Sequence, residues 1–335
     1  MRIVIDLPTP IAKQVFVAME RGDFPSVDDL AAAAFSQFLV GQSDSERRIQ
    51  GLDVDQDESW RALLASPLTD GPTASQQGSD DAGGWMWGMV NRVFPLKLAV
   101  RVCSNMCSQG PARLQSVQTQ VAECGVRIGA MLTADDKEHG RKRNECRAVG
   151  LPAAERGQKS SLRFAFHFLG RQLADGSFGG GCFDTGLLGP MNGKAQLISP
   201  TEAGWELSKL PNPVLDCVAM GTEIKGVANL SDAESEFYLS NVASSVPAER
   251  RAFAAILEAL EDGPLTSAAL ADAVSPYIPP GRSDSVVATT RSGAIGRLVD
   301  LKAIMREPTG RSAMLGITDR GSAFLRRAAG SDVLV

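Results

Sequence analysis

The stretch that decides the fold is residues 286–327, VVATTRSGAIGRLVDLKAIMREPTGRSAMLGITDRGSAFLRR. Its first part predicts a helix from about Ser285 to Leu301, because apolar residues recur at helical spacing. The packed side of this helix consists of Val287, Ala294, Ile295, Leu298 and Val299. A hairpin around the Pro-Thr-Gly turn at 308–310 follows, and Thr318 begins a short closing helix. The stretch therefore predicts a helix, a basic β-hairpin and a helix, in that order.

Two further helices are predicted just upstream. Four apolar residues at i, i+3, i+4 and i+7 form the packed face of the first, and they are Phe253, Ile256, Leu257 and Leu260. Gly263-Pro264 ends that helix, and Thr266 or Ser267 caps a second one that carries Leu270 and Val274. Residues 247–330 thus form one predicted domain.

An internal repeat predicts a second copy of this domain. LISPTEAGWEL at 197–207 is similar to LGITDRGSAFL at 315–325. Both stretches read as an apolar strand, then Thr-acid-x-Gly at a helix start, then an amphipathic helix. Each stretch also follows an Arg-bearing helix and a glycine-containing hairpin. We therefore expect a divergent copy at 85–215 and a connecting helix within 216–246, which a capping box of Ser231 and Glu234 begins.

The order of these elements resembles the winged helix-turn-helix family. In that family the third helix enters the major groove of DNA, and the tip of the hairpin, the wing, reaches phosphates or the minor groove. A helical wheel places four residues of 285–301 opposite the packed side, whereas Arg291 lies nearer to that side. The candidate DNA-binding residues of helix and wing are Thr289, Thr290, Gly293, Arg297, Arg306 and Arg311.

The divergent copy offers two further basic groups. Residues 159–175, KSSLRFAFHFLGRQLAD, fit either a strand or a helix, and we expect a helix because the apolar pattern continues past Gly170. Such a helix places Arg163, His167 and Arg171 on one face. The run Arg141, Lys142 and Arg143 is either a phosphate clamp or a solvated loop. The glycine-rich residues 176–193 predict a hairpin rather than a phosphate loop, since GxxxxGK[ST] is absent.

Residues 1–42 predict a strand followed by two helices. This order resembles the ribbon-helix-helix family of repressors and antitoxins, which implies a homodimer with a paired ribbon. Arg2, Val4 and Asp6 would face outward from the ribbon. Three basic against five acidic residues in this segment favour dimerisation over DNA reading. The polar residues 43–84 predict a flexible linker in which only Trp60 to Leu64 suggest a short helix.

Composition sets the remaining limits. The net charge is -5, yet residues 282–327 carry nine Lys/Arg against four Asp/Glu, and residues 135–163 carry eight against five. No signal peptide and no run of 18 apolar residues are present, which predicts a cytoplasmic protein without a membrane partner. Cys103 and Cys107 share a helical face and are either part of a zinc site or, as we expect for all six cysteines, inert thiols.

The sequence thus predicts a mainly α protein with small β: a ribbon-helix-helix N-terminus followed by two tandem winged-helix domains. The expected function is that of a dimeric DNA-binding protein of the transcriptional-regulator type, with double-stranded DNA and a second copy as partners. The alternative is an adaptor that uses winged helices to bind protein. No HExxH, GxSxG or paired acidic metal motif occurs, so we expect neither an enzyme nor a cofactor.

Overall fold

The structure is a computed structural model that describes residues 59–76, 85–86, 88–142, 145–153, 155, 157–191, 196–277, 283–309 and 312–331. These residues are mainly helical with small sheets, as predicted. The expected ribbon-helix-helix segment, with Arg2, lies outside the described residues.

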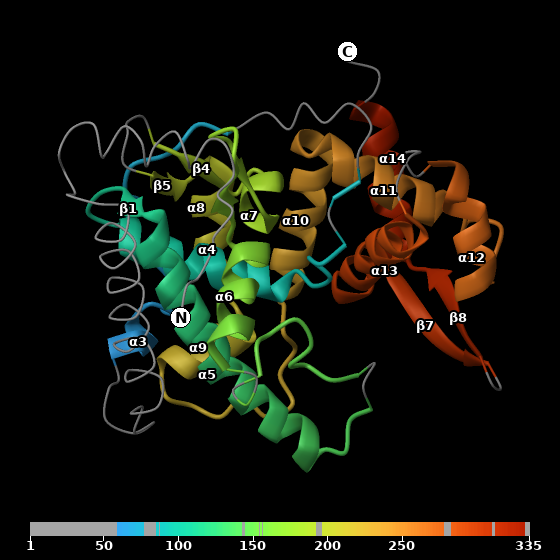
Figure 1. Cartoon of the computed structure of the whole chain (residues 1–335). Coiled ribbons are helices and arrows are strands. Elements are labelled where there is room, and N and C mark those ends of the chain that lie inside the picture. Colours follow the sequence, from blue (N-terminus) through green and yellow to red (C-terminus); the bar gives the residue numbers. More distant parts are fainter. Residues whose placement is uncertain are drawn as a thin grey trace, which may run out of the picture. The chain divides into compact units, whose positions relative to one another are not determined.

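Figure 1 shows the elements along the chain. The first part contains α3 (Ser59–Ala62), α4 (Phe94–Cys107), β1 (Ala112–Arg113), α5 (Leu114–Glu138), α6 (Gly157–Phe168), β2 (Arg171–Gln172), β3 (Phe178–Gly179), α7 (Gly181–Asp184), β4 (Leu188–Pro190), β5 (Leu197–Pro200) and α8 (Glu202–Lys209). The second part contains α9 (Pro213–Ala219), α10 (Asp232–Ser245), α11 (Pro247–Glu258), β6 (Leu265–Thr266), α12 (Ser267–Val274), the 3₁₀ turn η2 (Ser275–Tyr277), α13 (Asp284–Asp300), β7 (Ile304–Thr309), β8 (Ser312–Ile317) and α14 (Asp319–Ser331).

Two segments of the chain share one order of elements. The first repeat comprises α4, β1, α5, α6 with α7, β4, β5 and α8, and the second comprises α11, β6, α12, α13, β7, β8 and α14. Each contains a three-stranded antiparallel sheet in which the last strand is central, with orders β1-β5-β4 and β6-β8-β7. A single hydrophobic core cluster contains residues of both repeats.

The junction between the last strand and the closing helix is the same in both repeats. Thr201 and Thr318 cap the helices by accepting hydrogen bonds from the backbone N–H of Gly204 (3.1 Å) and Gly321 (3.3 Å). A Cβ on these glycines would lie 2.0 and 2.3 Å from a backbone oxygen of the preceding hairpin. The two similar stretches, 197–207 and 315–325, thus form the same capped strand-to-helix junction, and the close approach of helix to hairpin explains the glycine that both contain.

The first repeat differs from the second by a hairpin inserted between α6 and α7. The chain leaves α6 at Gly170 (φ 138°) and returns at Gly180 (φ 123°), conformations that favour glycine. A Cβ on Gly180 would lie 2.5 Å from the Gly170 Cα, so the two ends of the hairpin almost touch. The expectation that the helix continues through residue 175 is wrong, because Arg171 and Gln172 form strand β2.

Residues 59–76 pack against the first repeat, so the expectation of a flexible linker is wrong for them. Leu64 is fully buried. Its carbonyl accepts a hydrogen bond from Arg101 (2.9 Å), and the Asn105 amide donates to two carbonyls on either side of Leu64. Farther along, the Ala74 N–H donates to the Pro200 carbonyl at 2.9 Å. This segment satisfies buried polar groups of α4 and lies alongside β5.

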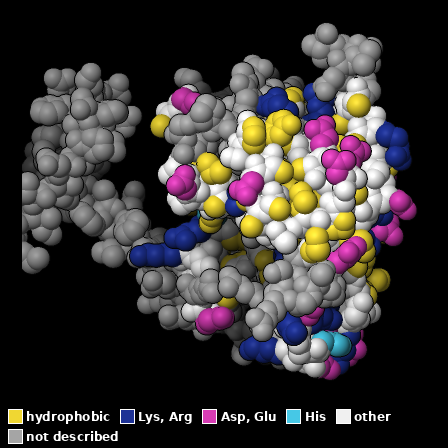
Figure 2. Space-filling view, turned by 90° about the vertical axis from the view of Figure 1, so that its right-hand side faces the viewer, with side chains coloured by type: hydrophobic (Ala, Val, Ile, Leu, Met, Phe, Trp, Pro, Cys, Tyr) yellow, Lys and Arg dark blue, Asp and Glu magenta, His cyan; other side chains and the backbone are white. Residues whose placement is uncertain are grey.

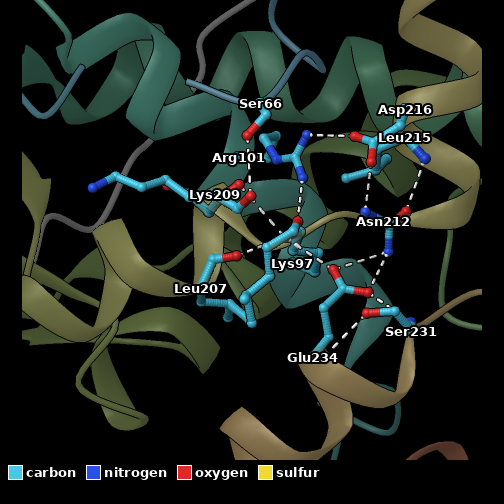
Figure 3. Close-up of polar contacts among 12 residues, drawn as sticks. Ser66, Lys97, Arg101, Leu207, Lys209, Asn212, Leu215, Asp216, Ser231 and Glu234 are labelled. Carbon is cyan, nitrogen blue, oxygen red and sulfur yellow. Dashed lines mark hydrogen bonds and ion pairs between the residues drawn. The ribbon is translucent and has the colours of Figure 1, made fainter. Parts of the chain in front are cut away.

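A buried polar cluster joins α4 to α8, α9 and α10 (Figure 3). The Lys97 ammonium pairs with Glu234 at 2.9 Å and donates to carbonyls at the end of α8. Burial lowers the pKa of Lys97 to about 8, although Glu234 acts in the opposite direction. Arg101 pairs with Asp216 at 2.8 Å, and the Asn212 amide donates to Glu234. Because both cations are fully buried, the cluster fixes the first repeat against the connecting segment.

The connecting helix is α10, and its predicted capping box is present. Ser231 accepts from the Glu234 N–H, and the Glu234 carboxylate accepts from the Ser231 N–H. α10 packs against α8 of the first repeat and against α11 and α14 of the second. It thereby links the two repeats, as the sequence predicted.

Candidate nucleic-acid interface

Arg297, predicted to enter a DNA groove, is fully buried. Its guanidinium donates two hydrogen bonds to the Glu249 carboxylate on α11, one at 2.7 Å, and a third to the Val90 carbonyl. The prediction that Arg297 contacts DNA is therefore wrong. The side chain instead holds together α13, α11 and the segment that leads into α4.

Thr290 and Gly293 are also buried, which overturns their predicted role in a DNA groove. Both face residues 88–92: a Cβ on Gly293 would lie 2.5 Å from the Gly88 oxygen, and one on Gly88 would lie 2.1 Å from the Thr289 oxygen. The Thr290 Oγ1 is buried without a hydrogen-bond partner among the described residues. The helical wheel predicted an exposed face for these residues because it does not include residues 88–92, against which α13 packs. The small residues of the Gly293-Ala-Ile-Gly296 pattern were the only local signal of this packing.

Few groups of α12 and α13 remain available to a ligand. Thr289 is exposed, but its hydroxyl donates to the Ser285 carbonyl of its own helix at 2.7 Å. Among the described residues between 264 and 290, only Asp272 and Asp284 are charged. On the face of the molecule in Figure 2, hydrophobic and uncharged side chains predominate in the middle, with acidic ones among them, and basic side chains lie toward the edges. The described residues 264–277 and 283–290 therefore offer no positive charge to phosphate.

The β7–β8 hairpin of the second repeat exposes one of the two arginines predicted there. Arg306 is exposed on β7, and its partial desolvation and the neighbouring charge of Arg92 lower its pKa. Arg92, which sequence reasoning missed, is half-buried and donates to the Gly296 carbonyl at 3.2 Å. The side chain of Arg311 lies outside the described residues. Arg306 of β7 and Arg92, from the segment before α4, are thus two neighbouring guanidinium groups.

The basic run after α5 is largely occupied within the chain. Arg141 pairs with Asp135 at 2.5 Å and with Asp136 at 3.1 Å, and Arg147 pairs with Asp135 at 2.6 Å. Lys142 is exposed, and Arg143 lies outside the described residues. Of the two interpretations of this run, a phosphate clamp fits Arg141 poorly because its charge is already neutralised.

The third helix of the first repeat presents the predicted basic face. Arg163 is exposed on α6 and Arg171 is exposed just after it, in β2. The His167 pKa is lowered, first by burial and then by the positive charges of Arg163 and Arg171. Lys159 is exposed one turn before Arg163. Arg163 and Arg171 thus both lie near His167, although Arg171 belongs to a strand rather than to the predicted helix.

Strand pairing extends this face sideways. Arg113 of β1 is exposed and lies opposite Leu197, next to Gln196, whose amide donates to the Gln172 side chain at 2.7 Å. We define the α6 strip as Arg113, Lys159, Arg163, His167 and Arg171. Among the described residues, none of its Lys and Arg side chains forms an ion pair. Within the described part of the chain, the Lys and Arg side chains of the α6 strip therefore form a surface of unpaired positive charge, which attracts polyanions.

The cysteines and the helices indicate no other chemistry in the described part of the chain. The thiols of Cys103 and Cys107 are buried 3.8 Å apart, and burial raises the pKa of Cys182, which lies in α7. No group of three metal-ligating side chains is found in the described ranges. None of the helices described is long and apolar enough to span a membrane.

Comparisons with known proteins assign no family to this chain. A scan against protein-family models, a search of curated proteins and a search of solved structures found no match to this chain.

Proposed function

We propose that the chain is a DNA-binding protein built on two tandem winged-helix domains. The order helix, strand, helix, helix, strand, strand, with the last strand central, supports this assignment in both repeats. In this assignment α6 and α13 are the third helices, and β4–β5 and β7–β8 are the wings. Because α13 is packed against residues 88–92, the first repeat rather than the second supplies the DNA-facing helix.

The observation that carries the proposal is the α6 strip. Its positive side chains lie along an exposed third helix and beside the end of the first wing, and none is paired in the described structure. An unpaired Arg on such a surface can donate bidentate hydrogen bonds to phosphate or to guanine. Arg306 on the second wing would add a contact to the phosphate backbone.

A second function is favoured for the second repeat. Its α12–α13 surface lacks Lys and Arg between 264 and 290 in the described residues, and it exposes 58% of Tyr277 and 39% of Val286. A surface that exposes apolar side chains and carries no positive charge suits a protein partner better than DNA. We therefore propose that the second repeat contacts a protein, and that DNA binding and protein binding are divided between the repeats.

The N-terminal segment completes the proposal. Residues 1–42 would pair two chains through a ribbon-helix-helix unit, which would present two α6 strips to a DNA site of matching symmetry. A dimer of this kind acts as a transcriptional regulator, the biological role that we propose.

The test is a salt titration of binding between the full chain and a 30-base-pair duplex. Arg163→Ala and Arg171→Ala should each lower affinity about tenfold and reduce the slope of log K against log salt by about one, since each removes one charged contact. Arg326→Ala is the matched control, because Arg326 is an exposed arginine of α14 outside the strip.

Equal affinities for all three variants and the wild-type protein would refute DNA binding through the α6 strip. Loss of affinity in the Arg326 variant alone would move the DNA site to α14.

A further inference from the structure

The α6 strip ends in a structure that the second repeat lacks. The hairpin β2–β3 leaves the helix between α6 and α7, and Arg171, the last member of the strip, is its first residue. Its base is fixed by the contact between Gly170 and Gly180 and by the Gln118 amide, which donates to the Gly170 carbonyl at 2.7 Å. The hairpin is thus anchored at its base, and Phe178 of β3 packs against Phe183 of α7.

Hydrogen bonds also hold the turn of the hairpin. The Leu173 N–H donates to the Ser177 carbonyl at 2.8 Å, and the Gly176 N–H donates to the Leu173 carbonyl at 3.0 Å. The Asp175 carboxylate accepts from the Ser177 N–H at 3.0 Å and from its hydroxyl at 2.6 Å. The Gln172 amide crosses the turn to the Gly176 carbonyl at 3.1 Å. A tip with this many bonds can enter a groove without a large loss of conformational entropy.

The three residues that lead into the turn have distinct chemistry. Arg171 and Gln172 are exposed, and the apolar Leu173 follows with 40% of its surface exposed. Proteins that bind the minor groove read it with Arg and Gln and insert apolar residues such as Leu between base steps. A partly exposed leucine that lies against Gly179 at a hydrogen-bonded turn, two residues after an arginine, matches both requirements.

We propose that the β2–β3 hairpin inserts into the minor groove of DNA next to the groove that α6 occupies, with Leu173 as a wedge between two base pairs. This inference rests on the proposed function, because α6 must first bring the hairpin to the duplex. The ligand is double-stranded DNA that can be unstacked at one step, and pyrimidine–purine steps are the most easily deformed.

The experiment uses the full chain and duplexes that carry 2-aminopurine at a central TA step, a probe whose fluorescence rises when a base is unstacked. The wild-type protein should raise the fluorescence at saturation, and Leu173→Ser should abolish most of the rise and lower affinity about tenfold. Leu68→Ser is the matched control, because Leu68 is 99% exposed in another segment and its replacement should change neither signal.

A second variant guards against damage to the hairpin. Asp175→Asn keeps an oxygen that can accept the turn hydrogen bonds but removes a negative charge at the tip. It should raise affinity about twofold at low salt, because one repulsion with phosphate disappears.

The outcomes separate the two proposals. One outcome would overturn the wedge and leave DNA binding by α6 intact. In it, Arg163→Ala lowers the affinity for DNA, whereas Leu173→Ser and Asp175→Asn change neither the fluorescence nor the affinity. Wild-type protein that binds no duplex would overturn both.

Discussion

Replacing Arg297 tests whether α13 is a structural helix or a reader of DNA. In Arg297→Ala, the buried Glu249 carboxylate loses both of its hydrogen bonds from the guanidinium, and the Val90 carbonyl loses its donor. Removing one partner of a buried ion pair costs about 3–5 kcal/mol, because the remaining charge is left desolvated. For a chain of this size that loss lowers Tm by about 10 °C.

The assay is urea denaturation followed by circular dichroism, with DNA affinity measured under folding conditions. The double variant Arg297→Met with Glu249→Met is the control, because it removes both charges and fills similar volume. It should recover most of the stability, since replacing a buried pair with apolar residues is often neutral. Folded Arg297→Ala protein should bind DNA as wild type does. An unchanged denaturation midpoint together with lost affinity would refute the buried placement of Arg297.

Further predictions address packing, pH and assembly. Gly293→Ala should destabilise the fold by roughly 2–4 kcal/mol in urea denaturation, since its Cβ would lie 2.5 Å from the Gly88 oxygen, whereas Gly110→Ala has open space and should be neutral. The Asp135 pKa is lowered, because hydrogen bonds from two arginines outweigh the opposite effect of burial. Its contribution to stability should be complete above the usual carboxyl pKa and disappear as pH falls through the lowered value. Asp135→Asn should flatten that acid loss, and an unchanged acid profile would contradict the assignment. Deleting residues 1–42 should convert a dimer to a monomer on size-exclusion chromatography, and a dimer that survives would exclude the proposed role of that segment.

The sequence predicted the parts of the fold that depend on local patterns. Helical periodicity located α11 and α13, and the capping residues Thr201, Ser231 and Thr266 each begin a helix as expected. The repeated Thr-acid-x-Gly sequence revealed the duplication, because helix capping and the close approach of glycine are both local requirements.

The predictions were wrong where segments distant in the sequence determine whether a residue is buried. Arg297 looked like a surface residue because the helical wheel contains no information about residues 88–92, which lie about two hundred positions earlier in the chain. The polar composition of 59–76 suggested a linker, yet its backbone serves as a set of acceptors for Arg101 and Asn105. For α6, the apolar pattern past Gly170 belonged to a hairpin rather than to another helical turn.

The contact between residues 88–92 and α13 also governs how the protein can fold. The Arg92 guanidinium reaches Gly296 across 204 positions, and the Asp300 carboxylate accepts from the Val93 N–H across 207. Contacts this remote in sequence slow folding, because a long loop must close before they form. The Asp300 carboxylate accepts hydrogen bonds from the Val93 and Phe94 N–H groups at the start of α4. During synthesis the start of α4 emerges long before Asp300, so these bonds form only after α13 has left the ribosome. The two repeats should therefore unfold as one cooperative unit, and a fragment that ends before residue 284 should expose the apolar surface that α13 covers.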